Sequence, residues 1–230
     1  MMKDFSAFEK RIGVTFINRD LLTQAFVHRS YINEHPDFSI GHNERLEFLG
    51  DAVLELVVTD HLYAKYPNPE GELTNWRASL VNAKMLAELA KEIDIESCLY
   101  MSRGESKDAG SKARMYILAN AFEAVVGAMY LDQGIEPVRK FIAEFLLSRL
   151  PYILEHELYF DPKSRFQEAA QEIAGATPSY RVIEEKGPDH AKEFKVGVYV
   201  GDELVAFGIG TSKQEAQIAA AEAALEKKGW

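Results

Sequence analysis

The chain contains a single cysteine, Cys98, among its 230 residues. One thiol excludes an intramolecular disulfide and leaves no cysteine spacing that would bind zinc. We therefore expect a reducing, cytoplasmic location, with Cys98 as a small core residue. No apolar run approaches membrane-spanning length, since Asp60 and His61 interrupt the longest one, and the N-terminus lacks the apolar segment of a secretory signal.

Basic residues are also scarce. The chain has 26 Lys and Arg against 36 Asp and Glu, which gives a formal net charge of −10 at pH 7. This balance argues against a general nucleic-acid binder, although binding depends on where the charges lie rather than on their total. A phosphodiesterase that holds metal ions must carry acidic residues in its site. An acidic chain and a nucleic-acid substrate are therefore compatible.

The spacing of apolar residues divides the chain in two. Up to about residue 150 it is helical, and the expected helices lie at 43–65 (ending near Pro67), 72–91, 113–131 and 137–150, with a polar loop at 101–112. After a polar segment near 155–162 a helix is expected at 163–174, and strands at 179–184, 193–200 and 203–209. A last helix begins at Ser212, where Glu215 completes a capping-box pattern. The prediction is an all-α domain over 1–155 and a small α+β domain over 160–230.

Three carboxylates interrupt the apolar run NERLEFLGDAVL at 43–54. Glu44, Glu47 and Asp51 are spaced i, i+3 and i+7, so they share one face of a helix. Their apolar neighbours predict a central, largely buried helix. Clustered buried carboxylates repel one another, and a hard divalent cation offsets that repulsion. The alternative is a solvated acidic stripe on an amphipathic helix.

A second polar pair lies in the apolar run ILANAFEAVV at 117–126. Asn120 and Glu123 are its only polar side chains, and their i, i+3 spacing places them on one helix face. Glu123 alone is equally compatible with an ion pair to a buried arginine. Two apolar helices with inward acids instead resemble bundles in which facing helices supply metal ligands. Ligands that are all oxygen favour Mg²⁺ or Mn²⁺ over Zn²⁺.

The sequence resembles the bacterial ribonuclease III family over nearly its whole length. The matching segments are QAFVHRSY at 24–31, NERLEFLGDAVL at 43–54, PEGELTNWRASLV at 69–81 and ILANAFEAVVGAMYLDQG at 117–134. The order of elements after residue 160, together with GTSKQEAQIAAAEAAL, looks like a double-stranded-RNA-binding domain. The resemblance implies a helical catalytic domain followed by that binding domain, and a homodimer in which each subunit cuts one strand.

The resemblance also implies roles for individual residues. Glu47, Asp51 and Glu123 match catalytic metal ligands, and Asn120 stands where many family members have a metal-binding aspartate. Asparagine offers a carbonyl oxygen but one negative charge fewer. Glu44 and Glu70 look like acids that contact substrate or support the site. Phe48 matches an aromatic residue that inserts into the partner subunit, whereas simple core packing is the alternative.

The C-terminal domain has its own candidates. Gln167 and Glu168 match residues that enter one minor groove of duplex RNA, and His190 matches a residue of the loop that enters the next. Ser212 and Lys213 begin the last helix, whose free N–H groups attract phosphate. This helix has Gln214 and Gln217 where family members often have lysines.

The acidic residues predict a site for Mg²⁺ or Mn²⁺, and the resemblance implies an endoribonuclease that uses the ion to hydrolyse double-stranded RNA. The resemblance implies 5′-phosphate and 3′-hydroxyl ends with short 3′ overhangs, and ribosomal and messenger precursors as substrates. The alternative is a non-catalytic double-stranded-RNA-binding or ribosome-associated protein, which only Asn120 favours.

Overall fold

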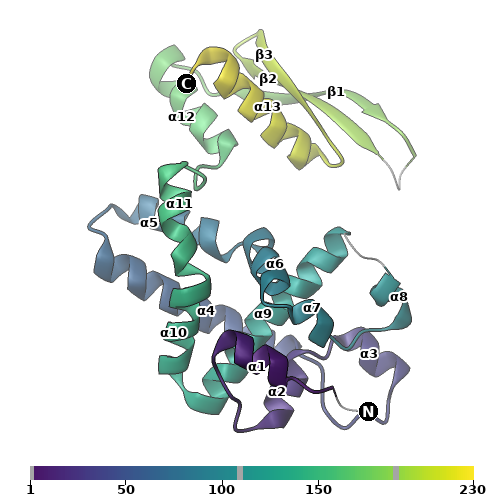
Figure 1. The fold of residues 1–230 in the computed structure, drawn as a ribbon. Helices are drawn as coiled ribbons and strands as arrows, with labels where there is room; N and C mark the ends of the chain where they lie inside the picture. Colours follow the sequence, from purple (N-terminus) through teal and green to yellow (C-terminus); the bar gives the residue numbers. More distant parts are fainter. Residues whose placement is uncertain (1–2, 108–110, 189–191) are drawn as a thin grey trace. The chain divides into compact units, whose positions relative to one another are not determined.

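The computed structural model describes residues 3–107, 111–188 and 192–230. They form two compact units that meet in sequence between Tyr159 and Phe160 (Figure 1). The first unit is helical, and the second combines two helices with a three-stranded sheet. The predicted fold class, an all-α domain followed by a small α+β domain, is confirmed. Among the described residues, no helix is long and apolar enough to cross a membrane.

Eleven α-helices and one 3-10 helix form the described part of the first unit. They are α1 (Ser6–Ile12), α2 (Arg19–Ala25), α3 (Arg29–Glu34), α4 (Glu44–Lys65), α5 (Glu70–Val81), α6 (Ala83–Glu92), α7 (Ile95–Cys98), α8 (Arg103–Lys107), α9 (Lys112–Gln133), α10 (Ile135–Phe145), η1 (Leu147–Arg149) and α11 (Leu150–Glu155).

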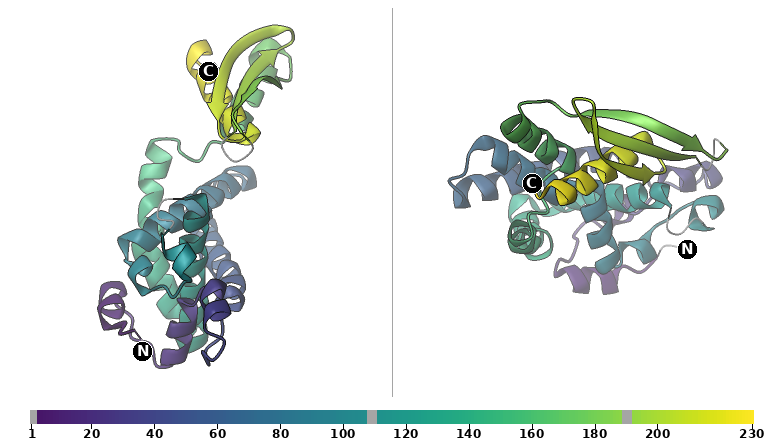
Figure 2. Two further views of the ribbon diagram at one scale, coloured as in Figure 1. Left: turned by 90° about the vertical axis from the view of Figure 1, so that its right-hand side faces the viewer. Right: turned by 90° about the horizontal axis from the view of Figure 1, so that it is seen from above.

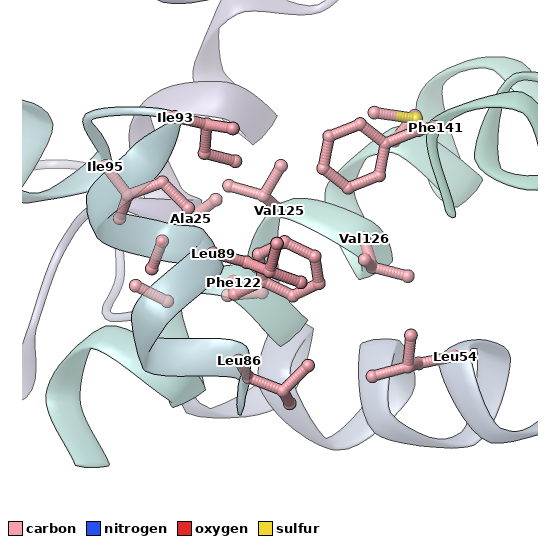
Figure 3. Packing of buried hydrophobic residues seen from close by; sticks show 14 of the residues in the cluster. Ala25, Leu54, Leu86, Leu89, Ile93, Ile95, Phe122, Val125, Val126 and Phe141 are labelled. Atoms are coloured by element: carbon pink, nitrogen blue, oxygen red, sulfur yellow. The ribbon is translucent and has the colours of Figure 1, made fainter. Parts of the chain in front are cut away.

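The core of this unit is built around α9, which packs against α4 and α6. About half of its residues are apolar and buried, because its sequence is apolar on nearly every face. Figure 3 shows Leu54 of α4, Leu89 of α6, Phe122 of α9 and Phe141 of α10 in this core. The Phe122 and Phe141 rings lie 5.5 Å apart between centroids. This apolar packing fixes α9 relative to α4.

Two glycines allow α4 and α9 to approach closely. A Cβ atom on Gly50 would lie 1.8 Å from the backbone oxygen of Glu123, and one on Gly127 would lie 2.2 Å from that of Leu46. No side chain fits at such distances. The backbones are therefore in contact where Glu47 and Asp51 flank Gly50.

We expect Gly50→Ala to destabilise the helical unit by about 3 kcal/mol, the upper end of the range for overpacking, because the added methyl meets backbone rather than a movable side chain. Urea unfolding followed by circular dichroism measures this loss. Gly71→Ala is the matched control, since nothing lies within 4 Å of a Cβ there and alanine favours a helix. Equal urea midpoints for Gly50→Ala and the unsubstituted chain would contradict the close crossing.

Several predicted boundaries in this unit were wrong. The periodic segment 72–91 is two helices, because the Asn82 side chain accepts a hydrogen bond from the Met85 N–H (3.0 Å) and begins α6. The loop 101–112 contains α8, and the helix predicted at 137–150 ends at Phe145 before η1 and α11. Helix α4 begins and ends as predicted, but it is not largely buried, since Phe48 and Leu56 are exposed.

The second unit runs in the order α12 (Pro162–Ala174), β1 (Ser179–Lys186), β2 (Glu193–Val200), β3 (Glu203–Gly210) and α13 (Lys213–Lys228). The strands are antiparallel in the order β1-β2-β3, and Figure 2 shows the twist of the sheet. Helix α13 packs on β2 and β3 through its alanines. A Cβ on Gly208 would lie 2.2 Å from the Ala220 nitrogen, so small residues on both sides allow this contact.

Candidate active site

The crossing of α4 and α9 brings the two acidic groups together. Helix α4 provides Glu47 and Asp51, and α9 provides Asn120 and Glu123. The carboxylates of Asp51 and Glu47 both act electrostatically on Glu123, and Asn120 hydrogen-bonds to Glu47. The structure therefore assembles the four predicted metal-site residues into one polar cluster.

Burial and neighbouring negative charge raise the pKa values of Glu123 and Glu47. Burial, followed by the charges of Asp51 and Glu47, raises the pKa of Glu123 from 4.5 to about 8. Burial and then Glu44 raise the pKa of Glu47, an effect that the hydrogen bond from Asn120 partly offsets. A bound cation would relieve the same repulsion.

The acids are more accessible than predicted. Glu44 and Asp51 are exposed, while Glu47, Asn120 and Glu123 are partly buried. The expectation of buried carboxylates was wrong because α4 has one face in solvent, beside the exposed Phe48. An open site of this kind can receive a group carried on a large polymer.

Neither a buried ion pair nor a fully solvated stripe accounts for these acids. The buried arginine of α9 is Arg114, whose guanidinium pairs with Glu96 at 3.0 Å. No ion pair of Glu123 is found among the described residues, so pairing with a buried arginine does not explain it. A fully solvated stripe does not explain the raised pKa values of Glu47 and Glu123.

The donor set fits a hard divalent cation. Three carboxylates and one amide oxygen are oxygen ligands of the kind that Mg²⁺ and Mn²⁺ prefer. In the described part of the chain, no three Asp, Glu, His or Cys side chains already stand at the spacing of a closed metal shell. Mg²⁺ usually keeps several waters and needs only one or two carboxylates, so an open set of oxygens suits it.

Glu44 lies at the edge of the cluster. Its carboxylate is 3.5 Å from Arg29 and 3.7 Å from His42, and its charge contributes to the raised pKa of Glu47. Glu44 is therefore an exposed acid beside Glu47, with Arg29 and His42 as its basic neighbours.

The structure does not bring Glu70 to the other acids within one chain. Glu70 begins α5 and lines a hollow of about 660 Å³ with Tyr63 and Arg77, near the C-terminal end of α4. At 1.5 Å per residue, Tyr63 is roughly 24 Å along α4 from Glu47. Glu70 therefore belongs to a separate surface of the same protomer.

Phe48 projects from α4 beside Glu47, and 82% of its surface is exposed. It borders a second hollow of about 640 Å³, whose lining includes Leu21, Leu49 and Leu131. The alternative that Phe48 packs in the core is wrong.

The candidates in the second unit lie on its helices. Gln167 and Glu168 are exposed on α12. Ser212 begins α13 and accepts a hydrogen bond from the Glu215 N–H at 3.2 Å. Lys213 is exposed and pairs with Glu185 at 3.1 Å, which balances part of its charge. His190 lies outside the described residues.

The sequence reasoning missed Gly50 and Gly127, which set the spacing of the site. A signal was available, because glycine inside a long helix costs about 1 kcal/mol relative to alanine and usually has a packing reason.

We expect Glu123→Gln to raise the thermal unfolding midpoint of the metal-free helical unit by roughly 2–4 °C at pH 8–9. The raised pKa means that ionising Glu123 costs more in the folded than in the unfolded chain, so this destabilisation grows as the pH rises from 4.5 through about 8. Glutamine does not ionise, and the difference should vanish near pH 4. Glu144→Gln, at an exposed position on α10, should show no such dependence. A pH-independent difference would contradict the assigned cause.

A helical unit with clustered carboxylates, followed by an α-β-β-β-α unit, defines a two-domain nuclease with an RNA-binding module. Family models agree: residues 18–150 match "Ribonuclease-III-like" and residues 162–228 match "Double-stranded RNA binding motif". The chain belongs to the ribonuclease III family, and it is an endoribonuclease that acts on double-stranded RNA.

Named relatives support this assignment. Ribonuclease 3 of Chloroflexus aurantiacus is 44% identical over 98% of this chain and 92% of its own length. Ribonuclease 3 of Carboxydothermus hydrogenoformans is 46% identical over 96% and 94%. The solved nuclease domain of ribonuclease III from Campylobacter jejuni is 34% identical, with a TM-score of 0.58, and covers 64% of this chain and 99% of its own.

Proposed function

We propose that this endoribonuclease depends on Mg²⁺, which Mn²⁺ can replace, and that Glu47, Asp51, Asn120 and Glu123 hold the ion. The observation that carries the proposal is the position of Glu123 opposite Glu47 and Asp51, where burial and their charges raise its pKa to about 8. When bound, such an ion would polarise the phosphate and make water a stronger nucleophile near neutral pH.

The side chains divide the remaining work. Asp51 is the exposed acid of the cluster and accepts a hydrogen bond from the attacking water, which orients it toward phosphorus. Glu47 and Glu123 supply the negative charge that retains the ion, and Glu44 contacts the RNA. Attack on phosphorus with cleavage of the P–O3′ bond leaves 5′-phosphate and 3′-hydroxyl ends.

The second unit holds the duplex. Gln167 and Glu168 can hydrogen-bond to 2′-hydroxyls in a minor groove, and the N-terminus of α13 at Ser212 and Lys213 meets phosphate across the major groove. His190 is proposed for the next minor groove. Structured precursors of ribosomal and messenger RNA present such duplexes.

We further propose a homodimer through the exposed face of α4. Phe48, Leu56 and Tyr63 are large exposed apolar side chains spaced i, i+8 and i+15, so they share that face. The nuclease domain from Campylobacter jejuni shows structural flexibility in a region involved in its own dimer formation. Two sites, each cutting one strand, would leave short 3′ overhangs. Glu70, remote from the acidic cluster of its own chain, would then support the site of the partner subunit.

A reducing, cytoplasmic location remains a prediction from the single cysteine.

A labelled duplex of about 30 base pairs tests the metal dependence. Cleavage should require Mg²⁺, stop with excess EDTA and resume when Mg²⁺ or Mn²⁺ is restored. The non-catalytic alternative, favoured only by Asn120, requires duplex binding with no cleavage in any of these conditions. Cleavage that is unaffected by EDTA would contradict the metal proposal.

We expect Asn120→Asp to shift the Mg²⁺ midpoint of cleavage to a lower concentration, by roughly three- to tenfold, because it adds a charge within a site of low effective dielectric. The measurement is a Mg²⁺ titration of the initial cleavage rate. Asn68→Asp is the control, since Asn68 hydrogen-bonds to Glu72 beside the hollow near Tyr63, away from the cluster. An unchanged midpoint would place Asn120 outside the coordination sphere.

A further inference from the structure

The face of the sheet that points away from α13 carries a cluster of large side chains. We call it the outer sheet face and define it by Ile183, Tyr199, Leu204, Phe207 and Ile209, with the cations Arg181 and Lys195. Phe207 and Ile209 are 49% and 50% exposed, and Ile183 and Leu204 are also exposed. Scattered exposed apolar residues are ordinary, but a contiguous group marks an interaction surface.

The strand register shows that these residues are contiguous. Tyr199 pairs with Leu204, Gly197 with Phe207, and Lys195 with Ile209. Gly197 has no side chain, and the side chains of Leu204 and Ile183 fill the position above it. A Cβ on Gly197 would lie 2.8 Å from Leu204 and 2.9 Å from Ile183. The bulge between Val182 and Glu184 turns Ile183 toward this space. The result is a platform of two rings and three aliphatic side chains.

Both cations of the outer sheet face lie over its rings. The Arg181 guanidinium is 4.6 Å from the centroid of the Tyr199 ring, and the Lys195 ammonium is 4.1 Å from that of Phe207. Within the described ranges, neither cation has a carboxylate at ion-pair distance. Glu184 is the register partner of Lys195, but its carboxylate pairs with Lys186 at 2.9 Å. Arg181 and Lys195 therefore keep their charge available to an anion.

The duplex-binding candidates lie on the other side of the sheet. Lys213 pairs with Glu185 and lies 5.5 Å from the centroid of the Phe194 ring. Glu185 and Phe194 are register partners, and they alternate along their strands with the outward Glu184 and Lys195. A ligand on the outer sheet face therefore does not compete directly for Lys213.

We propose that the outer sheet face binds single-stranded RNA, such as an unpaired segment that flanks or closes a duplex substrate. Aromatic side chains on a sheet stack unpaired bases, and adjacent cations attract the phosphates between them. The planar Arg181 guanidinium can also stack on a base, and the Lys195 ammonium attracts phosphate as a point charge. The outer sheet face supplies both kinds of contact, whereas an apolar protein partner would bury two cations without acids to pair with them. The proposal rests on the RNA-binding assignment of this unit but not on the nuclease chemistry.

The test is fluorescence anisotropy of a labelled seven-nucleotide single strand with the full chain in EDTA. Phe207→Ser should weaken binding by about tenfold, as loss of one stacked base predicts, and Lys195→Gln by a few fold. Phe207→Tyr, which keeps a ring, should bind nearly as the unsubstituted chain does. Gln167→Ala is the matched control on the helical side, and it should weaken binding of a blunt duplex while leaving the single strand unaffected.

Specific outcomes would overturn the proposal. One is single-strand binding that is unaffected by Phe207→Ser and Lys195→Gln, and another is binding that Gln167→Ala weakens equally or that a blunt duplex displaces. Absence of single-strand binding at concentrations that saturate the duplex would also overturn it. The unsubstituted chain could also form assemblies larger than a dimer and bind no single strand. If Phe207→Ser abolished those assemblies, the outer sheet face would be a protein interface instead. Duplex binding is measured in parallel. If the full chain binds duplex but none of the expected single-strand results is found, the proposal for the outer sheet face fails while the RNA-binding assignment of the second unit stands. Circular dichroism of each variant checks folding.

Discussion

Glu123→Gln should lower the rate of duplex cleavage by roughly 10²–10³-fold while leaving duplex affinity within about twofold, because the proposed metal site loses one of the carboxylates that hold the ion while the binding surface is untouched. Glu123 faces Glu47 and Asp51, and burial, followed by the charges of Asp51 and Glu47, raises its pKa to about 8. The RNA-binding candidates Gln167 and Lys213 lie in the other unit. Single-turnover cleavage and filter binding measure the two quantities separately.

Two controls make this result specific. Glu144→Gln changes an exposed acid on α10 and should leave both quantities unaltered. Raising Mg²⁺ should rescue Glu123→Gln in part, since a weakened site fills at higher concentration. Near-normal cleavage at ordinary Mg²⁺ would show that Glu123 is not a metal ligand. Equal losses of cleavage and binding would indicate a misfolded helical unit instead.

The sequence predicted the elements of the site because its signal is local. The i, i+3 and i+7 spacing of Glu44, Glu47 and Asp51 fixes their common face once a helix forms. The same holds for Asn120 and Glu123 on α9. What brings the two faces together is not local. It depends on Gly50 and Gly127, whose close approach becomes visible only when both backbones are present.

Burial was predicted less well than secondary structure. An apolar pattern shows that a side chain avoids water, but it does not show what covers it. Phe48 and Leu56 match the apolar pattern of α4, yet both are exposed. If the proposed dimer forms, Phe48 and Leu56 become buried, as their pattern predicts. The pattern does not show that a second chain covers them. Similarly, the periodicity across 72–91 hid the break at Asn82, because one side-chain cap outweighs the preference for a continued helix.

Charge was the least informative part of the sequence. The net charge of −10 argues against RNA binding, but it sums the acids of the site with the surface of the second unit. Within that unit, Lys213 pairs with Glu185, while Arg181 and Lys195 lie over aromatic rings. The position of each cation, rather than the sum, decides which surface can meet phosphate.

Removal of the second unit should greatly weaken binding of duplex RNA. A chain that ends after Tyr159 keeps the edge-on contact between Tyr159 and Trp76, and with it the packing of the helical unit. It loses Gln167, Lys213 and the N-terminus of α13. We expect duplex affinity at about 200 mM salt to fall by two orders of magnitude or more, because each lost phosphate contact removes attraction that the remaining acidic surface does not replace.

The salt dependence distinguishes this explanation from simple damage. Cleavage by the shortened chain should survive at about 50 mM salt or with abundant Mg²⁺, where phosphate attraction is strong, and should disappear near 200 mM, where the full chain still cuts. Sedimentation should show the same oligomeric state for both chains, since the exposed face of α4 is retained. Equal affinity and cleavage at every salt concentration would show that residues 160–230 do not hold the duplex. A loss of cleavage even at low salt, with the fold intact, would instead mean that these residues help to position the scissile phosphate in the site.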